Sequence, residues 1–246
     1  MKKRRIRHNL FIHDIKGPLS VVETGIKTML DRPDIGPLTD KQHRVLRRLM
    51  RNTKLVQSLV NDTLEIERPE YASQNIRTVM LSQIIFSTLK EICDITATTI
   101  PVSISADQEL ASLQEILLRA DIALVINQEL WDTEITISVN RMQQVLRNLL
   151  SNAIKYRKKQ IEVGFSLNEY ALNFYVKDDG KGIPKNLHKK IFECYFQLNS
   201  DDEKTLRCHG LGLAGVQVLV EDMNGILNLE SDINQGATFS VTLPLN

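Results

Sequence analysis

The chain has 246 residues, of which 42% are hydrophobic, an ordinary content for a soluble globular protein with one large domain or two smaller ones. Its formal net charge of +1 provides no global field that would attract a nucleic acid, so nucleic-acid binding is not expected. The three cysteines have no paired metal-ligand spacing, which argues against a disulfide framework and a zinc site and indicates a reducing compartment.

The first eight residues, MKKRRIRH, contain five Lys or Arg side chains. Such a cluster is typical of the cytoplasmic flank of a membrane span outside this chain, and equally of a solvated helix end. No run of 18 apolar residues and no signal peptide is visible in the sequence. We therefore expect a cytoplasmic chain, either by itself or as the cytoplasmic part of a membrane-bound sensor.

The N-terminal part of the chain is predicted to form a hairpin of two helices. An apolar residue recurs every three or four positions from Phe11 to Met29, and two prolines and a glycine follow Leu30 and end this helix. A second helix is expected over Asp40–Glu67, with Thr39 or Asp40 as its N-cap. Its apolar stripe is too wide for one hairpin to bury, so we expect two chains to form a four-helix bundle.

His13 and Asp14 are neighbours on the first predicted helix. His13 lies about 200° around the helix from Ile15 and so points away from the apolar face. Pro18 removes a backbone donor five residues later and is expected to bend or loosen the helix. An exposed histidine is usually an ordinary surface residue, so a chemical role for this pair depends on motifs farther along the chain.

From residue 70 onward, strand-like segments alternate with helical ones, and we place a domain boundary at 69/70. Strands and helices mixed in this order indicate an α+β fold with helices covering one face of a sheet. Strands are expected at Ile76–Leu81, Pro101–Ser105, Ile122–Asn127, Glu134–Val139, Gln160–Leu167, Tyr170–Lys177, Ile226–Glu230 and Ala237–Leu243. Helices are expected at Gln83–Thr96, Gln108–Ala120, Arg141–Tyr156 and Gly212–Met223.

One of these predicted helices carries a stripe of polar side chains on one face: Asn148, Asn152, Lys155 and Tyr156. An amide oxygen is a suitable ligand for a hard cation, and a lysine one turn later can meet phosphate oxygens. An ordinary solvent-exposed face would have the same pattern.

Two glycine-containing stretches have features of a ligand site. In DDGKG, Asp178 ends a strand and can accept a hydrogen bond from an exocyclic amine, while Gly180 and Gly182 let the backbone approach a ligand closely. Gly210 and Gly212 come directly before a predicted helix, whose N-terminus favours an anion. Taken separately, the first stretch is also a simple turn and the second an ordinary helix start.

In this order, the motifs resemble those of the two-component sensor histidine kinases, which join a helical dimerisation and phosphotransfer domain to an ATP-binding domain of the Hsp90-like fold. HDIKGPL resembles the H-box of that family, RNLLSNAIKY its N-box and DDGKGIP its first glycine box. IFECYFQ resembles the phenylalanine box, HGLGLAGVQVLVEDMNG the second glycine box, and ESDINQGATFSVTLPL the closing strands. Neither a Walker-type GxxxxGK[ST] nor a strand–GxGxxG–helix arrangement occurs, which disfavours an unrelated nucleotide fold.

The resemblance implies a homodimeric protein histidine kinase, with residues 1–69 as the dimerisation and phosphotransfer hairpin and residues 70–246 as a two-layer α/β sandwich that binds ATP and Mg²⁺. His13 would accept the phosphoryl group, with Asp14 as general base, and pass it to an aspartate in the receiver domain of a response regulator. The alternative is a non-catalytic, nucleotide-binding dimeric scaffold, or pseudokinase. This alternative is disfavoured because the implied phosphate acceptor, the general base, the metal ligands and the carboxylate that would bind adenine are all present.

The resemblance also implies roles within the ATP site. Asp178 would bind the adenine amine, Asn152 and Asn148 would hold Mg²⁺, and Lys155 and Tyr156 would contact the phosphates. A lid would extend over residues 185–209, be anchored by Phe192 and Phe196, and hinge at Gly210 and Gly212. The full set implied to contact the nucleotide or its metal is Asn148, Asn152, Lys155, Tyr156, Asp178, Gly180, Gly182, Ile183, Phe192, Gly210, Leu211 and Gly212.

Some residues depart from the family pattern. Gly17 stands where many relatives carry Thr or Asn, so little phosphatase activity toward the receiver is expected. Asp179 replaces the usual Asn, and Cys208 and His209 replace the expected Gly and Thr, so lid closure should differ in detail. The stretch Pro101–Trp131 is longer than usual by roughly one helix and is expected to be a surface elaboration or a partner site.

Overall fold

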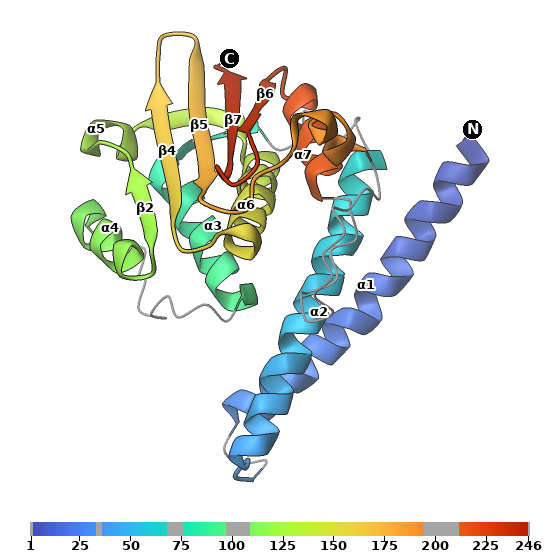
Figure 1. Ribbon diagram of the computed structural model, residues 1–246. Helices are drawn as coiled ribbons and strands as arrows, with labels where there is room; N and C mark the ends of the chain where they lie inside the picture. Colours follow the sequence, from blue (N-terminus) through green and yellow to red (C-terminus); the bar gives the residue numbers. More distant parts are fainter. Residues whose placement is uncertain (1, 33–35, 68–75, 97–108, 194–211, 246) are drawn as a thin grey trace. The chain divides into compact units, whose positions relative to one another are not determined.

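The computed structural model describes residues 2–32, 36–67, 76–96, 109–193 and 212–245. Within the helices, the side chains of residues 2–14, of several residues between 51 and 67, and of residues 93–96 lie outside this description. The chain divides into two compact units, Met1–Glu67 and Arg68–Asn246, and each is described by itself (Figure 1).

The first unit consists of two long helices, α1 (Lys2–Asp31) and α2 (Asp40–Glu67), which pack against each other as a hairpin (Figure 1). Helix α1 continues through Pro18, so the predicted loosening does not interrupt it. At the start of α2, the backbone N–H of Thr39 donates to Gln42 Oε1 at 2.8 Å and the N–H of Gln42 donates to Thr39 Oγ1 at 3.3 Å. This reciprocal pair is a capping box, and it makes Thr39 the N-cap.

The hairpin buries few of its described apolar side chains. Ile26 and Leu46 are buried, and Gln57 Nε2 donates to Glu23 Oε2 at 2.8 Å between the two helices. A larger group of apolar side chains is exposed on the two helices: Val21, Val22, Met29, Val45, Leu49 and Val56. The apolar surface that the sequence predicted to exceed the needs of one hairpin is therefore present.

The second unit is built on a five-stranded sheet with the strand order β2-β4-β5-β7-β6 (Figure 1). The first pair of strands, β2 and β4, is parallel, and the other neighbours are antiparallel. The strands are β2 (Ile122–Val125), β4 (Ile161–Leu167), β5 (Ala171–Asp178), β7 (Ala237–Pro244) and β6 (Ile226–Ser231). A separate antiparallel pair joins β1 (Ile76–Met80) to β3 (Glu134–Ser138).

Helices cover one face of the five-stranded sheet, and the hydrophobic core lies between the two layers (Figure 1). They are α3 (Leu81–Thr96), α6 (Val139–Tyr156) and α7 (Gly212–Asp222), while α4 (Leu110–Arg119) packs beside β2. Met142 and Leu149 of α6 and Phe174 of β5 are fully buried in this core. The predicted α+β fold, a helical hairpin followed by a two-layer α/β sandwich, is confirmed.

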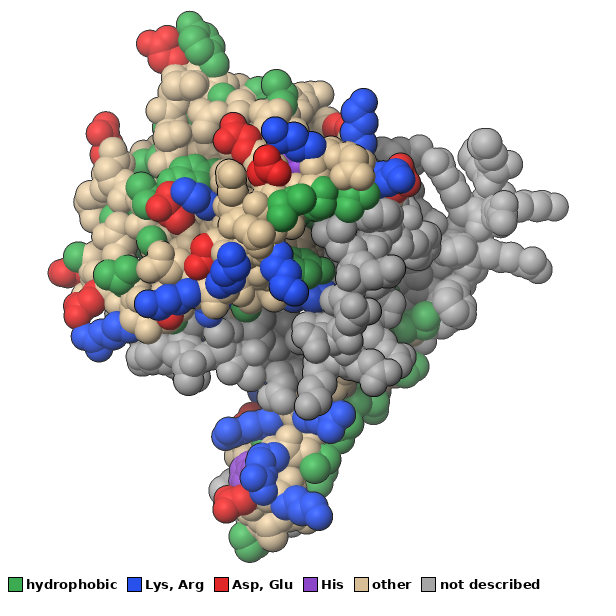
Figure 2. Space-filling model, viewed as in Figure 1, with side chains coloured by type: hydrophobic (Ala, Val, Ile, Leu, Met, Phe, Trp, Pro, Cys, Tyr) green, Lys and Arg blue, Asp and Glu red, His purple; other side chains and the backbone are tan. Residues whose placement is uncertain are grey.

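The opposite face of the sheet presents polar side chains that alternate with the core residues. Tyr175 Oη donates to Glu162 Oε1 at 2.7 Å, and Thr242 Oγ1 donates to Asn173 Oδ1 at 2.8 Å. Burial and the Glu162 carboxylate raise the pKa of Tyr175 to about 12. Figure 2 shows basic and acidic side chains interspersed on the visible face of this unit.

Most predicted elements occur within a few residues of their expected bounds, but three details differ. The strand β2 ends at Val125, and the short helix α5 (Gln128–Trp131), which was not predicted, follows it. Helix α6 begins at Val139, before the predicted start at Arg141. Two short 3-10 helices, η3 (Lys185–Leu187) and η4 (Lys190–Phe192), occupy the stretch predicted as irregular. The predicted strand Pro101–Ser105 lies outside the described residues.

Among the described residues, no helix combines the length and the apolar character that a membrane span requires.

Candidate functional site

The candidate site lies where β5 ends at Asp178, a carboxylate that is only 7% exposed. Its Oδ1 accepts the backbone N–H of Gly180 at 2.8 Å. Burial raises the pKa of Asp178, the N–H groups of Gly180 and Ala237 lower it, and the charge of Asp179 raises it, with a net increase. A buried carboxylate has acceptor capacity for more than these donors, so it can take the N–H of a ligand.

Gly180 lets the loop after β5 touch the end of α6. A Cβ at this position would come within 2.6 Å of Asp178 Oδ1 and even closer to the backbone oxygen of Tyr156. A side chain would therefore push the end of α6 away from the end of β5. The glycine thus lets the loop after Asp178 lie close to the backbone of Tyr156, the last residue of α6.

None of the four residues of the predicted polar stripe is among the residues that α6 buries in the core. Tyr156 is 46% exposed, and Lys155 Nζ donates to its Oη at 3.0 Å and lies 4.7 Å from its ring centroid. Asn148 Nδ2 donates to the backbone oxygen of Gly212 at 3.5 Å, which joins α6 to the first residue of α7. This contact uses the amide nitrogen of Asn148, and its amide oxygen, like that of Asn152, is of a type that can ligate a hard cation such as Mg²⁺.

Asp179 holds the segment that leaves α6. Its Oδ1 accepts the backbone N–H groups of Lys158 at 2.9 Å and Lys159 at 3.0 Å, and its Oδ2 accepts that of Lys159 at 3.1 Å. Desolvation acts to raise the pKa of Asp179, but the backbone N–H groups of Lys159, Gln160, Lys158 and Asp179 itself together outweigh it and hold the pKa below the ordinary value. Asp179, which stands where the family usually has Asn, is therefore a hydrogen-bond acceptor for the backbone that follows α6.

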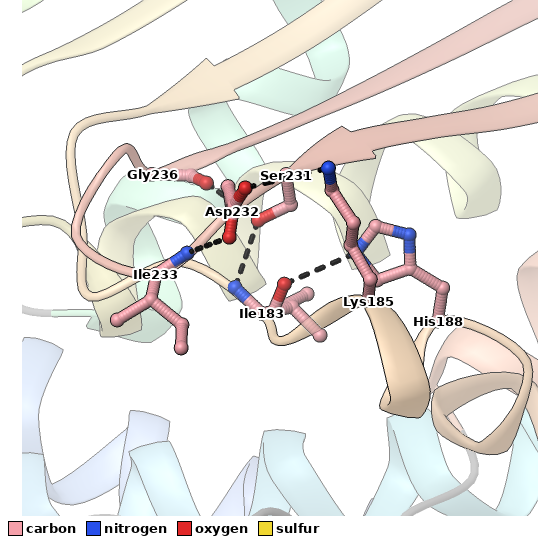
Figure 3. Close-up of polar contacts among 7 residues, drawn as sticks. All are labelled: Ile183, Lys185, His188, Ser231, Asp232, Ile233 and Gly236. Carbon is pink, nitrogen blue, oxygen red and sulfur yellow. Dashed lines mark hydrogen bonds and ion pairs between the residues drawn. The ribbon is translucent and has the colours of Figure 1, made fainter.

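The other end of the loop is bound to the turn between β6 and β7 (Figure 3). The backbone N–H of Ile183, a buried residue, donates to Ser231 Oγ at 2.8 Å, and Ser231 Oγ donates to the backbone oxygen of Gly236 at 2.6 Å. Between these anchors Gly182 has φ +69°, and a Cβ there would collide with the backbone oxygen of Asp232. The backbone of Ile183 is thus tied to the β6–β7 turn, and its predicted contact with a nucleotide stays a prediction.

Phe192 lies in the first part of the predicted lid. Its ring packs edge-on against Phe239 of β7, with centroids 6.4 Å apart and planes at 86°. It also lines an open hollow of about 340 Å³ together with His188, Gln217 and Leu229. Residues 194–211 of the predicted lid and hinge, which include Phe196, Cys208, His209, Gly210 and Leu211, lie outside the described residues.

The predicted acceptor pair belongs to the other unit. His13 and Asp14 are part of α1, but their side chains lie outside the described ones. The roles of acceptor and base therefore stay predictions.

Residues of the β6–β7 turn were not singled out in the sequence, although they fall within the stretch that resembles the closing strands. Ser231 is the last residue of a strand, and a strand pattern shows only that such a residue is polar. Gly236, with φ +76°, carried the one local signal, because a glycine between a polar turn and an apolar strand indicates a special backbone conformation.

Two protein-family models match the chain. Residues 12–72 match the His Kinase A (phospho-acceptor) domain, and residues 137–246 match the histidine kinase-, DNA gyrase B- and HSP90-like ATPases. The first match covers α2 and most of α1, and the second covers α6 and every strand from β4 to β7.

Curated relatives match over nearly the whole chain. The circadian input-output histidine kinase CikA of Synechococcus elongatus is 30% identical over 237 residues, which are 94% of this chain and 29% of that protein. The sensor histidine kinase AtsR of Burkholderia thailandensis is 25% identical over 238 residues, which are 95% of this chain and 36% of that protein. The chain therefore spans about a third of the length of these relatives.

Solved structures share the fold. The crystal structure of full-length ShkA in complex with AMPPNP superposes with a TM-score of 0.62 at 21% identity, covering 97% of this chain and 45% of that one. The Acinetobacter baumannii histidine kinase AdeS gives a TM-score of 0.54 at 18% identity, covering 95% of this chain and 98% of that one.

Together, the fold and the matched families define a class of protein in which a helical phospho-acceptor domain is joined to an ATPase domain of the HSP90 type. Within that class, the chain belongs to the sensor histidine kinases of two-component signalling.

Proposed function

We propose that this chain is an ATP-dependent kinase core that phosphorylates its own His13 and then transfers the phosphoryl group to an aspartate of a response regulator. The observation that carries the proposal is Asp178, a buried carboxylate at a strand end beside a glycine that contacts the end of α6. This arrangement lies in the part of the chain that matches the ATPase family.

The nucleotide would lie between the loop after β5 and the polar face of α6. Asp178 accepts an N–H of the adenine amine, and the buried side chain of Ile183 offers an apolar wall for the base. Lys155 and Tyr156 contact the phosphates. Asn148 and Asn152 hold Mg²⁺, which when bound neutralises charge that develops on the phosphate oxygens.

The chemical step is an in-line displacement at the γ-phosphorus. Asp14 accepts the proton of one ring nitrogen of His13, so that the other ring nitrogen can attack. A P–N bond forms while the bond from the γ-phosphorus to the bridging oxygen breaks, and ADP leaves. In the second step a carboxylate oxygen of the receiver attacks the phosphorus, and the histidine is restored.

We further propose that the chain works as a homodimer in the cytoplasm. The exposed apolar side chains of α1 and α2 provide surface for a second hairpin, and a bundle of four helices would cover it. Each such side chain would lose contact with water in the dimer. This burial would stabilise the dimer by about 25 cal/mol for each Å² of apolar surface.

Incubation with γ-labelled ATP and Mg²⁺ tests the proposal. We expect the chain to gain a label that is lost in acid and kept in alkali, and to pass that label to a receiver protein. If the chain binds ATP but gains no label, the proposed activity is wrong and the chain is the non-catalytic scaffold instead.

A further inference from the structure

The loop after β5 rests on the β6–β7 turn through several contacts, and a single side chain lies at their centre (Figure 3). Besides the two hydrogen bonds of Ser231, the backbone N–H of Asn234 donates to the backbone oxygen of Lys181 at 2.7 Å. His188 Nε2 lies 3.0 Å from the backbone oxygen of Ile183. Lys185 Nζ lies 3.6 Å from Asp232 Oδ2, but both side chains are well exposed and such a pair contributes little.

We infer that Ser231 is a positioning residue for the nucleotide site, because its hydroxyl holds the loop between Asp178 and Ile183 in the shape that binds the base. The inference rests on the proposed function, in which Asp178 binds adenine. Ser231 itself does not contact Asp178, so it acts through the backbone of the loop and of the turn.

The hydroxyl suits this place because it accepts and donates at the same time. It accepts the N–H of Ile183 and donates to the oxygen of Gly236, over distances of 2.8 and 2.6 Å. Gly236 in turn packs so tightly on the backbone oxygen of Asp178 that a Cβ at Gly236 would collide with it. Ser231 is therefore connected to Ile183, at the far end of the loop, by a direct hydrogen bond, and through Gly236 to the backbone of Asp178.

Loss of this anchor is expected to affect binding more than chemistry. One end of the loop is fixed by Asp178 Oδ1 and Gly180, and Ser231 fixes the other. Gly182 between them is the residue type with the greatest backbone freedom. Without the anchor the loop samples more conformations, and the nucleotide has to order it on binding. Once the nucleotide is bound, the reacting phosphate lies at the α6 side of the site and is unaffected.

The test compares three variants of the whole chain with the unmodified protein. Ser231→Ala removes both hydrogen bonds, Ser231→Thr keeps the hydroxyl, and Ser240→Ala removes a hydroxyl from the middle of the adjacent strand β7. Calorimetry with ADP gives Kd, and autophosphorylation at varied ATP gives KM and kcat.

We expect Ser231→Ala to raise Kd and KM about tenfold, the effect of losing one to two hydrogen bonds of ordinary strength, with kcat nearly unchanged. Ser231→Thr should restore most of the affinity, and Ser240→Ala should leave it unchanged. The inference is overturned if Ser231→Ala binds ADP as the unmodified chain does, if threonine restores nothing, or if kcat falls while KM stays constant.

A measurement on the unmodified chain decides the matter if Ser231→Ala does not fold. Hydrogen exchange should show the amide of Ile183 protected even without nucleotide, because its N–H already donates a hydrogen bond to Ser231 Oγ. Exchange as fast as that of exposed loop amides would overturn the inference. Failure of the unmodified chain to bind ADP is a different result, since it would remove the proposed function and this inference with it.

Discussion

Asp178 combines a cost in folding with a proposed role in nucleotide binding. Burial raises its pKa, which means that the folded chain favours the protonated form of this carboxyl more than the unfolded chain does. The stability linked to that form is fully present below the unfolded pKa of about 3.9 and is lost as the pH rises through the higher folded value. At neutral pH the fold therefore keeps a buried charge that an uncharged side chain would avoid, and the ligand site gains a strong acceptor.

For Asp178→Asn at pH 7 we expect ADP affinity to fall at least about tenfold, because the amide presents a donor to the adenine amine and leaves a polar group unpaired. The melting temperature should stay equal or rise, since the charge is no longer buried and the amide oxygen can still accept the N–H of Gly180. Calorimetry and thermal unfolding of the same sample check both. Unchanged affinity would show that the adenine pocket lies elsewhere.

The pKa of Asp179 is lowered, whereas that of Asp178 is raised, so Asp179 should contribute to the stability of the fold at neutral pH. Asp179→Ala removes three hydrogen bonds to the backbone of Lys158 and Lys159, and because the carboxylate is partly exposed we expect a loss of about 1 kcal/mol in the free energy of unfolding. Because the folded state lowers the pKa of Asp179, its carboxylate stabilises the folded chain at pH values above the unfolded pKa of about 3.9. This stabilisation is lost as the pH falls through the folded pKa.

Denaturant unfolding of Asp179→Ala at pH 7 and below pH 3.9 checks this dependence, with Glu169→Ala as the control for the loss of an exposed surface carboxylate. The difference from the unmodified chain should shrink at the lower pH. A difference that is independent of pH would show that the carboxylate charge does not act on these N–H groups.

Among the secondary-structure elements, those with a clear period were predictable and those held by single side chains were not. Helix α6 combines an apolar face with polar residues over 18 residues, so its existence could be predicted from the sequence, while the role of its polar residues in a site stays a prediction. Helix α5 has only four residues, too few for a period, and the side chain of Asn127 caps it by accepting the N–H of Leu130 at 2.8 Å. In the same way, the anchoring hydroxyl of Ser231 depends on a partner 48 positions away in the chain.

Helix α1 offers a test of the departure at Gly17. A Cβ at this position would meet no atom within 4 Å among the described residues, so the first atom of a side chain fits there without a clash. Gly17→Thr or Gly17→Asn places a hydrogen-bonding group one turn from His13, on the same face, where it can orient a water molecule on a bound phospho-receiver. We expect faster receiver dephosphorylation with autophosphorylation largely kept.

Both rates are measured on the same samples, and Gly25→Thr is the control because Gly25 also lies in α1 with no atom near its Cβ position. Impaired autophosphorylation with unchanged dephosphorylation would mean that Gly17 provides clearance for the nucleotide instead. Rapid dephosphorylation by the unmodified chain would refute the expectation directly.

For the whole molecule, the family could be recognised because its residues recur in a fixed order along the chain, even though each motif alone has an ordinary explanation. The proposed dimer rests on a different property, the apolar surface that the hairpin leaves exposed. Leu49→Glu places a charge on that surface, since Leu49 is 49% exposed, and is expected to shift the chain from dimer to monomer.

Sedimentation at several concentrations measures this shift. Leu118→Glu is the matched control, because Leu118 is also an exposed leucine on a helix, 64% exposed, but belongs to the second unit. A monomeric unmodified chain, or a Leu49→Glu variant that stays dimeric, would contradict the proposed four-helix bundle.

The most direct test of the central claim is the site of the phosphoryl group on α1, which carries both His8 and His13. The account predicts that the chain incubated with γ-labelled ATP and Mg²⁺ gains an acid-labile, alkali-stable label, that His13→Gln abolishes this label while ADP binding persists, and that His8→Gln keeps it. Label that survives in His13→Gln would contradict the account.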